Sequence, residues 1–272
     1  MFDEQLAQTA AGMLRSVREN KPLVHSITNY VTMNYTANAL LACGASAVMA
    51  HAEEEVEEMA RIADALVLNV GTLEPARLES MLKAGRTANR CTIPIILDPV
   101  GAGATTLRTR ACKRLLSELS IQVVRGNPSE ILSLLQEASG TKGVESVHLV
   151  EESVEVALHL AKTYALTVAI TGKVDFVTDG GRTLRVHNGH AMMGLLTGAG
   201  CAATAVIGAF ASVGLDRLEA TAAALSYFGL AGEKAAEKAA GPGTFQVRFL
   251  DALYRLGEED LRQGAKIEKR LP

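Results

Sequence analysis

The chain has 272 residues, 48% of them hydrophobic and 21% charged, with a formal net charge of −3 at pH 7. This composition is typical of a soluble globular protein that can bury a sizeable apolar core. It excludes nucleic-acid binding through a basic surface, because the net charge is negative and no run of Lys or Arg precedes the C-terminal tail.

Short apolar runs alternate with longer amphipathic segments over the first 165 residues. The apolar runs predict strands at residues 23–27, 45–50, 65–70, 93–97 and 121–125. Helices are predicted at residues 3–19, 31–42, 75–89, 106–119 and 152–164. A further, acidic helix is predicted to end at about residue 63, and another is predicted to begin at residues 127–130. Because uniformly apolar strands alternate with helices, we expect a mostly parallel sheet covered by helices on both faces.

The pattern changes after residue 165. Strands are predicted at residues 166–171, 174–178 and 183–186, and an Asp-Gly turn at residues 179–180 predicts an antiparallel hairpin at one edge of the sheet. Helices are predicted at residues 201–213, 216–239 and 244–256, followed by a mobile tail at residues 266–272. With no linker or internal repeat, residues 1–272 are expected to form a single domain.

Residues 191–215 carry no charge and are long enough to span a bilayer. Five of them are glycines and no basic flank sets a topology, so a loop followed by a buried helix is the preferred interpretation. The N-terminus lacks an apolar signal core, and the four cysteines show no metal-binding spacing. We therefore expect reduced thiols, no membrane association and a cytoplasmic location.

The strongest functional signal is LTGAGCAATA at residues 196–205. Gly198, Ala199 and Gly200 precede an alanine-rich helix, and Cys201 lies where the loop becomes helix. The first amides of a helix have no internal partner, and the helix dipole there favours negative charge. Such a loop suits a phosphate or a developing anion, although Gly-x-Gly before a helix is often only a tight turn.

Ligands of open α/β sheets bind at the carboxyl ends of the strands. The residues that follow the predicted strands are Asn29, Met49, Gly71, Thr72, Asp98, Arg125, Asn127, Glu130 and Thr171. The carboxylates of Asp98 and Glu130 suit Mg²⁺, which prefers oxygen ligands and keeps several waters. Each also has a purely structural interpretation, Asp98 as a turn residue and Glu130 as an acid in the first turn of a helix. Arg125 could pair with a phosphate or with an acidic neighbour.

Two of these motifs carry a family resemblance. Asn-Pro-x-Glu at residues 127–130, followed downstream by Gly-Ala-Gly-x at residues 198–201, resembles the layout of ribokinase-like kinases. Most members have Asp, the general base, where this chain has Cys201. With HSITNYV at 25–31, AVMA at 47–50, DPVGA at 98–102 and GPGTF at 241–245, the chain resembles the hydroxyethylthiazole kinase family over nearly its whole length. That family implies a ribokinase-like three-layer α/β sandwich.

The resemblance also implies an activity, which is ATP- and Mg²⁺-dependent phosphorylation of the primary alcohol of 4-methyl-5-(2-hydroxyethyl)thiazole in thiamine salvage. It further implies a homotrimer with each active site at a subunit boundary. The site residues that we assign are Met49, Gly198, Asn29, Gly71 and Thr72 for the thiazole, Arg125, Thr171 and Asn127 for ATP, and Asp98 and Glu130 for Mg²⁺ through water.

Phosphoryl transfer needs positioning and charge neutralisation more than covalent chemistry. The amides of residues 198–201 would therefore stabilise the transferring phosphoryl group. A helix N-terminus lowers the pKa of a thiol, but an adjacent phosphate raises it. We accordingly expect Cys201 to be a weak base or a packing residue.

Three alternative functions are kept open. Cys201 could be the nucleophile of a thiol enzyme, with His25, His187 or His190 as its base. The sequence Gly101-Ala102-Gly103 after a strand could belong to a nucleotide-binding oxidoreductase, although Thr106 stands where the fingerprint needs Gly or Ala. The chain could also bind a thiazole or a nucleotide without catalysis.

Overall fold

The computed structural model describes residues 2–135 and 146–270, and their strands form one sheet in the order β2-β1-β3-β4-β5-β6-β7-β8-β9. The parallel strands are β1 (Leu23–Ile27), β2 (Ser46–Val48), β3 (Ala65–Asn69), β4 (Ile95–Asp98), β5 (Val123–Gly126) and β6 (Thr167–Ile170). The antiparallel strands at one edge are β7 (Asp175–Thr178), β8 (Thr183–Val186) and β9 (Ile267–Arg270). The predicted mostly parallel sheet with an antiparallel edge is confirmed.

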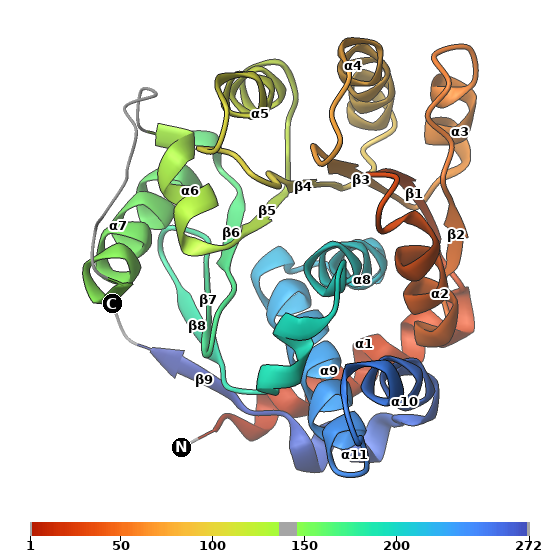
Figure 1. Cartoon of the computed structure of the whole chain (residues 1–272), viewed down its shortest axis with the longest axis vertical. Coiled ribbons are helices and arrows are strands. Elements are labelled where there is room, and N and C mark those ends of the chain that lie inside the picture. The colour runs from red at the N-terminus through yellow and green to blue at the C-terminus, as the bar shows by residue number, and fades with distance from the viewer. Residues whose placement is uncertain (1, 136–145, 271–272) are drawn as a thin grey trace.

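Helices cover both faces of this sheet, as Figure 1 shows. On the outer side lie α3 (Val56–Ile62), α4 (Pro75–Arg90), α5 (Thr106–Glu118), α6 (Pro128–Leu135) and α7 (Ser146–Tyr164). On the inner side lie α1 (Glu4–Asn20), α2 (Met33–Cys43), η1 (Ala191–Leu195), α8 (Ala199–Val213), α9 (Arg217–Ala236), α10 (Pro242–Arg255) and α11 (Glu258–Gly264). The chain is therefore a three-layer α/β sandwich.

Strand side chains alternate between the two layers of helices because successive residues of a strand point to opposite faces. In β3, Ala65 and Val67 belong to the inner apolar cluster, whereas Leu66 and Leu68 belong to the outer one. Burial on both faces explains why these strands are uniformly apolar in sequence.

The uncharged run forms η1 and then the buried helix α8, which packs across β1, β3 and β4. Small residues permit this close approach, since a Cβ placed on Gly208 would lie 3.1 Å from Cγ2 of Val67. Within the described ranges, no helix combines the length and the apolar character needed to cross a membrane. The interpretation of this run as a loop and a core helix is correct.

The prediction of a mobile tail is wrong for residues 267–270, which form β9 beside β8. The side chain of Ile267 is buried, and its carbonyl accepts the amide of Asp3 at 2.8 Å. These residues form a charged tail in the sequence, but they are ordered because they pair with the otherwise unpaired edge of β8. Residues 271–272 lie outside the described residues, and helix α11 was not predicted.

Candidate active site

Three buried polar side chains form a hydrogen-bonded row across the carboxyl ends of neighbouring strands. Asn69 ends β3 and stands opposite Asp98, which ends β4. Asn29 follows β1, on the other side of β3. The Nδ2 atom of Asn29 donates to Oδ1 of Asn69 at 3.0 Å, and Nδ2 of Asn69 donates to Oδ2 of Asp98 at 2.8 Å. The sheet thus connects Asn29 to Asp98, two residues that the sequence predicts separately, through a third residue.

The first turns of α8 lie directly against this row. Asn29 Nδ2 donates to Sγ of Cys201 at 3.3 Å, and the Thr204 hydroxyl donates to Oδ2 of Asp98 at 2.9 Å. Gly198 is the N-cap of α8 in the left-handed region, with φ of 90°, and a Cβ there would lie 2.7 Å from Cγ2 of Thr32. Only glycine fits this position, which sets where the free amides of the helix begin.

Arg125 reaches the same helix terminus from the end of β5. A Cβ on Gly200 would lie 2.6 Å from Nη1 of Arg125, and Nη2 of Arg125 donates to Oγ1 of Thr171. The Nε atom of Arg125 is buried with no hydrogen-bond partner among the described residues. A guanidinium and a helix N-terminus therefore converge, and both favour an anion.

Asp98 is the buried carboxylate of the site. Burial raises its pKa to about 6, while the Arg125 charge lowers the pKa and the Glu130 charge raises it. Its Oδ1 atom has no hydrogen-bond partner among the described residues. At neutral pH the structure thus holds an ionised carboxylate with one free oxygen, which is costly unless something binds there.

Glu130 is an acid in the first turn of α6, which is the structural interpretation given from the sequence, and it also faces the site. Its Oε2 accepts the amide of Asn127 at 2.9 Å, while Oδ1 of Asn127 accepts the amide of Glu130 at 2.9 Å, so the two residues form a capping box on α6. Its Oε1 accepts the amide of Gly101 at 2.9 Å. A carboxylate oxygen with one such bond still has a free lone pair.

The donor set fits Mg²⁺ better than a transition metal. In the part of the chain that the structure describes, no three His, Cys, Asp or Glu side chains gather as a metal cluster. Mg²⁺ needs few protein ligands because it keeps several waters. The free oxygen of Asp98 and the remaining lone pairs of Glu130 would suit such a hydrated ion.

Two of the predicted substrate residues, Gly71 and Thr72, lie beside Asn29 and Tyr30. A Cβ on Gly71 would lie 2.9 Å from Cβ of Asn29, so Gly71 packs directly against that side chain. Thr72, at φ of 44°, accepts the amide of Tyr30 on Oγ1 at 3.2 Å. Met49 is half-buried beyond β2, the strand beside β1. Contact of any of these residues with a substrate stays a prediction.

The sequence patterns missed several residues of this region. Asn69 carries the same signal as Asp98, a polar residue that ends an apolar strand, and could have been found. Arg77 carries no such signal. It is buried, donates from Nη1 to the carbonyl of Thr28 at 3.2 Å and lies 4.0 Å over the Tyr30 ring. Buried Asp175 accepts the Gly172 amide at 2.9 Å, and burial raises its pKa to about 6.

The histidines do not support a thiol enzyme. His25 bonds through Nε2 to the carbonyl of Ala50 at 2.7 Å, and His187 bonds through Nε2 to Glu268 at 2.9 Å. His190 accepts the amide of Met192 on Nδ1 at 3.2 Å. Within the described residues, none of these histidines hydrogen-bonds to Cys201, whose sulfur accepts from Asn29 instead.

The glycine turn at residues 101–103 does not support a dinucleotide site. The amide of Gly101 donates to Glu130 at 2.9 Å, and that of Gly103 donates to the Thr109 hydroxyl at 2.9 Å. A pyrophosphate would need these amides free.

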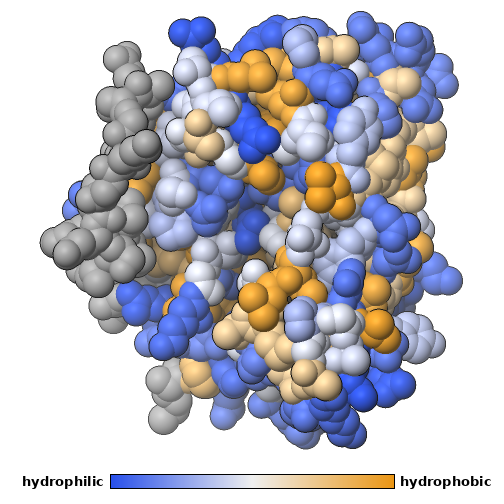
Figure 2. All heavy atoms as spheres, in the orientation of Figure 1, coloured by the Kyte–Doolittle hydropathy of each residue, from blue (hydrophilic) through white to orange (hydrophobic). Residues whose placement is uncertain are grey.

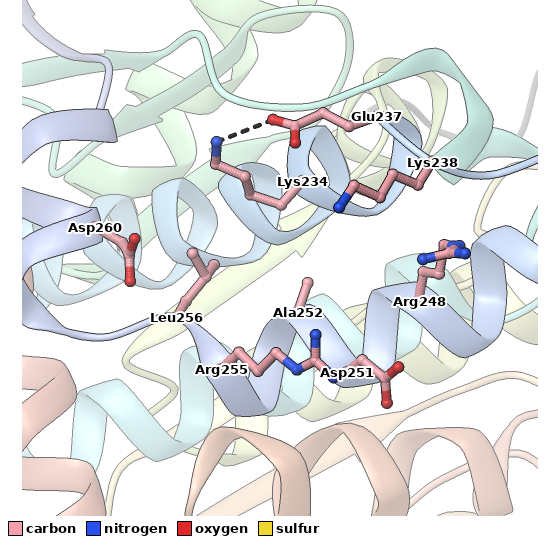
Figure 3. A pocket seen from close by; sticks show the side chains of 9 residues that line it. All are labelled: Lys234, Glu237, Lys238, Arg248, Asp251, Ala252, Arg255, Leu256 and Asp260. Carbon is pink, nitrogen blue, oxygen red and sulfur yellow. Dashed lines mark hydrogen bonds and ion pairs between the residues drawn. The ribbon is translucent and has the colours of Figure 1, made fainter.

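A separate surface pocket lies among α9, α10 and α11 and contains none of the predicted site residues. Its charged lining is mixed, and Lys234 and Glu237 form an ion pair at 2.9 Å (Figure 3). Most of these side chains are exposed. All three carboxylates that line it are exposed, so the strand ends remain the better candidate.

Comparison with known protein families shows that residues 14–259 match the family described as the hydroxyethylthiazole kinase family. A hydroxyethylthiazole kinase of Desulfotalea psychrophila is 53% identical over 264 residues, which cover 97% of each chain. A hydroxyethylthiazole kinase of Pyrococcus horikoshii is 51% identical over 257 residues, which cover 94% of this chain and 96% of the relative.

Solved structures agree with these sequence comparisons. The structure of a hydroxyethylthiazole kinase from Pyrococcus horikoshii matches with a TM-score of 0.88 and 48% identity, over 96% of this chain and 99% of the other. A Staphylococcus aureus pyridoxal kinase in complex with pyridoxal matches with a TM-score of 0.64 and 18% identity, over 92% and 98%. A ribokinase-like superfamily protein from Enterococcus faecalis also scores 0.64, at 12% identity and 89% coverage of both chains. The last two likenesses show the fold alone.

Proposed function

The chain belongs to the hydroxyethylthiazole kinase family, and from this premise we propose that it transfers the γ-phosphoryl group of ATP to the primary alcohol of 4-methyl-5-(2-hydroxyethyl)thiazole in thiamine salvage. The observation that carries the proposal is the buried row from Asn29 to Asp98 beneath the N-terminus of α8. It brings together a helix N-terminus, which favours an anion, an ionised carboxylate and a set of buried polar side chains.

The roles follow from that placement. The alcohol would lie near Asn29, Met49 and Cys201, and the amides at the start of α8 would hold the transferring phosphoryl group as charge spreads over its oxygens. Arg125, with Thr171 and Asn127, would hold ATP. When bound through Asp98 and Glu130, Mg²⁺ supplies charge neutralisation at the phosphates. A loose transition state asks little of a base for the alcohol proton.

Cys201 is expected to contribute little to the rate. Burial and then the Asp98 charge raise the pKa of its thiol, so the sulfur is protonated at neutral pH. Cys201→Ser should keep kcat within about tenfold, because a protonated thiol is not a general base and a loose transition state asks little of one. Cys201→Asp should also be tolerated. Steady-state kinetics checks both, with exposed Cys91→Ser as the control. A complete loss in folded Cys201→Ser protein would assign the chemistry to the thiol.

Activity is expected to fall as the pH drops below about 6. The pKa of Asp98 is raised from 3.8 to about 6, so its carboxylate becomes neutral there and loses its attraction for a divalent ion. The folded chain binds this extra proton between about pH 4 and 6, so the group stabilises the fold below that window and the stabilisation is lost as the pH rises through it.

A kcat/KM profile from pH 5 to 8, measured by a coupled assay of ADP release, checks this dependence. As a control, ADP is added directly at each pH to show that the coupling enzymes of the assay remain active. A flat profile would contradict the role given to the Asp98 carboxylate.

We further propose a single-domain cytoplasmic enzyme that acts as a homotrimer with its sites between subunits. Large apolar side chains beside the site support a partner surface, since Tyr30, Val31 and Leu195 are 53%, 67% and 65% exposed. The face drawn in Figure 2 carries separate hydrophobic patches among hydrophilic side chains. Light scattering with size-exclusion chromatography tests the trimer, and a monomer that turns over at full rate would refute the shared site.

A coupled assay of ADP release tests the activity itself. Purified protein with ATP, Mg²⁺ and the thiazole alcohol should turn over, and it should do so better than with a panel of sugar, pyrimidine and pyridine alcohols. Ligand-induced thermal stabilisation without ADP release would instead indicate a non-catalytic binding protein.

A further inference from the structure

Asn69 occupies the middle of the buried row, between the two halves of the site. It ends β3, which lies between β1 and β4 in the sheet, and its side chain is 1% exposed. On one side it contacts Asn29, which bonds to Cys201, and on the other it contacts Asp98. No other described residue hydrogen-bonds to both Asn29 and Asp98 through its side chain.

The orientation of the Asn69 amide is fixed by its partners. Its Oδ1 accepts two donors, Nδ2 of Asn29 at 3.0 Å and the amide of Gly71 at 3.0 Å, while its Nδ2 donates to the Asp98 carboxylate. A flipped amide would oppose two N–H donors with a third and would face a carboxylate with an oxygen. Because both errors occur in a buried site, only one orientation is stable.

This fixed amide determines how its neighbours can act. One Nδ2 hydrogen of Asn29 is directed to Asn69, which leaves the other for Sγ of Cys201. At Asp98, Nδ2 of Asn69 and the Thr204 hydroxyl both occupy Oδ2, so Oδ1 is the oxygen that remains free. Asn69 thereby fixes the orientation of the Asn29 amide and of the Asp98 carboxylate relative to each other.

We propose that Asn69 is a positioning residue that couples the Asn29 side of the site, where the alcohol would bind, to the carboxylate at Asp98. It touches neither substrate nor metal and acts through these two neighbours. The inference rests on the proposed function, which supplies the ligands of both halves. A merely structural asparagine would affect stability without changing either ligand's affinity.

The chain offers a matched control in Asn188, which is 5% exposed. Its Nδ2 donates to Glu233 at 3.1 Å and to the Gly264 carbonyl at 2.9 Å, and its Oδ1 accepts the Lys266 amide at 2.8 Å. Asn188→Ala removes another buried amide, outside the site. It should lower thermal stability without changing ligand affinity.

The test compares Asn69→Ala with Asn188→Ala by two binding measurements that need no turnover. Calorimetry measures the affinity for the thiazole alcohol without nucleotide or divalent ion, and Mn²⁺ with ADP probes the carboxylate side. Asn69→Ala should weaken both by about 10–100-fold, the usual effect of removing a residue that orients a ligand-binding group. Thr204→Val, whose hydroxyl bonds to Asp98 and to the Gly200 carbonyl but not to Asn29, should weaken Mn²⁺ binding alone.

Each outcome decides the proposal. If Asn69→Ala binds both ligands like wild type, or loses no more affinity than Asn188→Ala, Asn69 is not a positioning residue. If Asn69→Ala does not fold, Asn69→Ser, whose single hydroxyl cannot satisfy both neighbours, gives the same comparison. Failure of wild-type protein to bind the alcohol refutes the proposed function instead, so the two failures are distinguishable.

Discussion

Gly200→Val is expected to lower kcat by about 10³-fold or more while the protein still folds. Loss of a single donor to a developing oxyanion costs about 10²–10³-fold, and valine would block the helix terminus that supplies several. A Cβ at this position would also lie 2.6 Å from Nη1 of Arg125, so the guanidinium must leave the terminus. Folding should survive because Gly200 lies in the first turn of α8 at a helical φ, where a side chain is tolerated.

A graded series makes this result interpretable. Gly200→Ala should cost less than Gly200→Val, because both place a Cβ against Arg125 but only valine adds two methyl groups that would cover the amides. Gly12→Val in α1 is the matched control, since a Cβ there meets nothing within 4 Å. Steady-state kinetics and thermal melts of the three variants provide the comparison. An unchanged kcat in Gly200→Val would remove the amide cradle from the mechanism.

Asp98→Asn is expected to lower activity by about 10³-fold and to leave stability equal or higher. The shift of its pKa from 3.8 to about 6 means that the ionised form is disfavoured by on the order of 3 kcal/mol relative to water. An amide oxygen can still accept from Asn69 and Thr204, so the row remains bonded while the buried charge is removed. Opposite effects on activity and stability are typical of a residue kept for function.

Asp64→Asn is the control for this change. Its carboxylate accepts the amide of Leu23 at 2.7 Å, at the opposite end of the same sheet. Kinetics with varied Mg²⁺ and thermal melts of both variants should separate them, with activity lost only in Asp98→Asn. Full activity of Asp98→Asn at saturating Mg²⁺ would mean that the divalent ion is held elsewhere.

Much of the fold could be predicted because it is encoded locally. Apolar runs such as those of β3 and β4 identify buried parallel strands by composition alone, and the Asp-Gly turn identifies the antiparallel hairpin. The short helix α11 and the strand β9 were missed. The strand β9 is ordered by the free edge of β8 and by contact with Asp3. That edge is formed by residues about 85 positions earlier, so no local pattern reports it.

The site could be predicted only in part. Placing Asn29 and Asp98 at strand ends needed no structure, since the carboxyl ends of parallel strands share one edge. Asn69 carries the same strand-end signal as Asp98, but its bonds to both Asn29 and Asp98 can be known only once the strand order is known. The direction of the Cys201 pKa was equally open, since burial opposes the helix terminus and only the packing decides between them.

The sequence by itself determined a helix-covered parallel sheet and a glycine-rich helix start at residues 198–201, because periodicity and turn chemistry act over a few residues. The tertiary structure alone decided that β3 lies between β1 and β4 and that Asn69 therefore joins Asn29 to Asp98. The physical reason is that hydrogen bonds between strand ends depend on which strands become neighbours. That order is set by packing of the whole sheet against its two layers of helices.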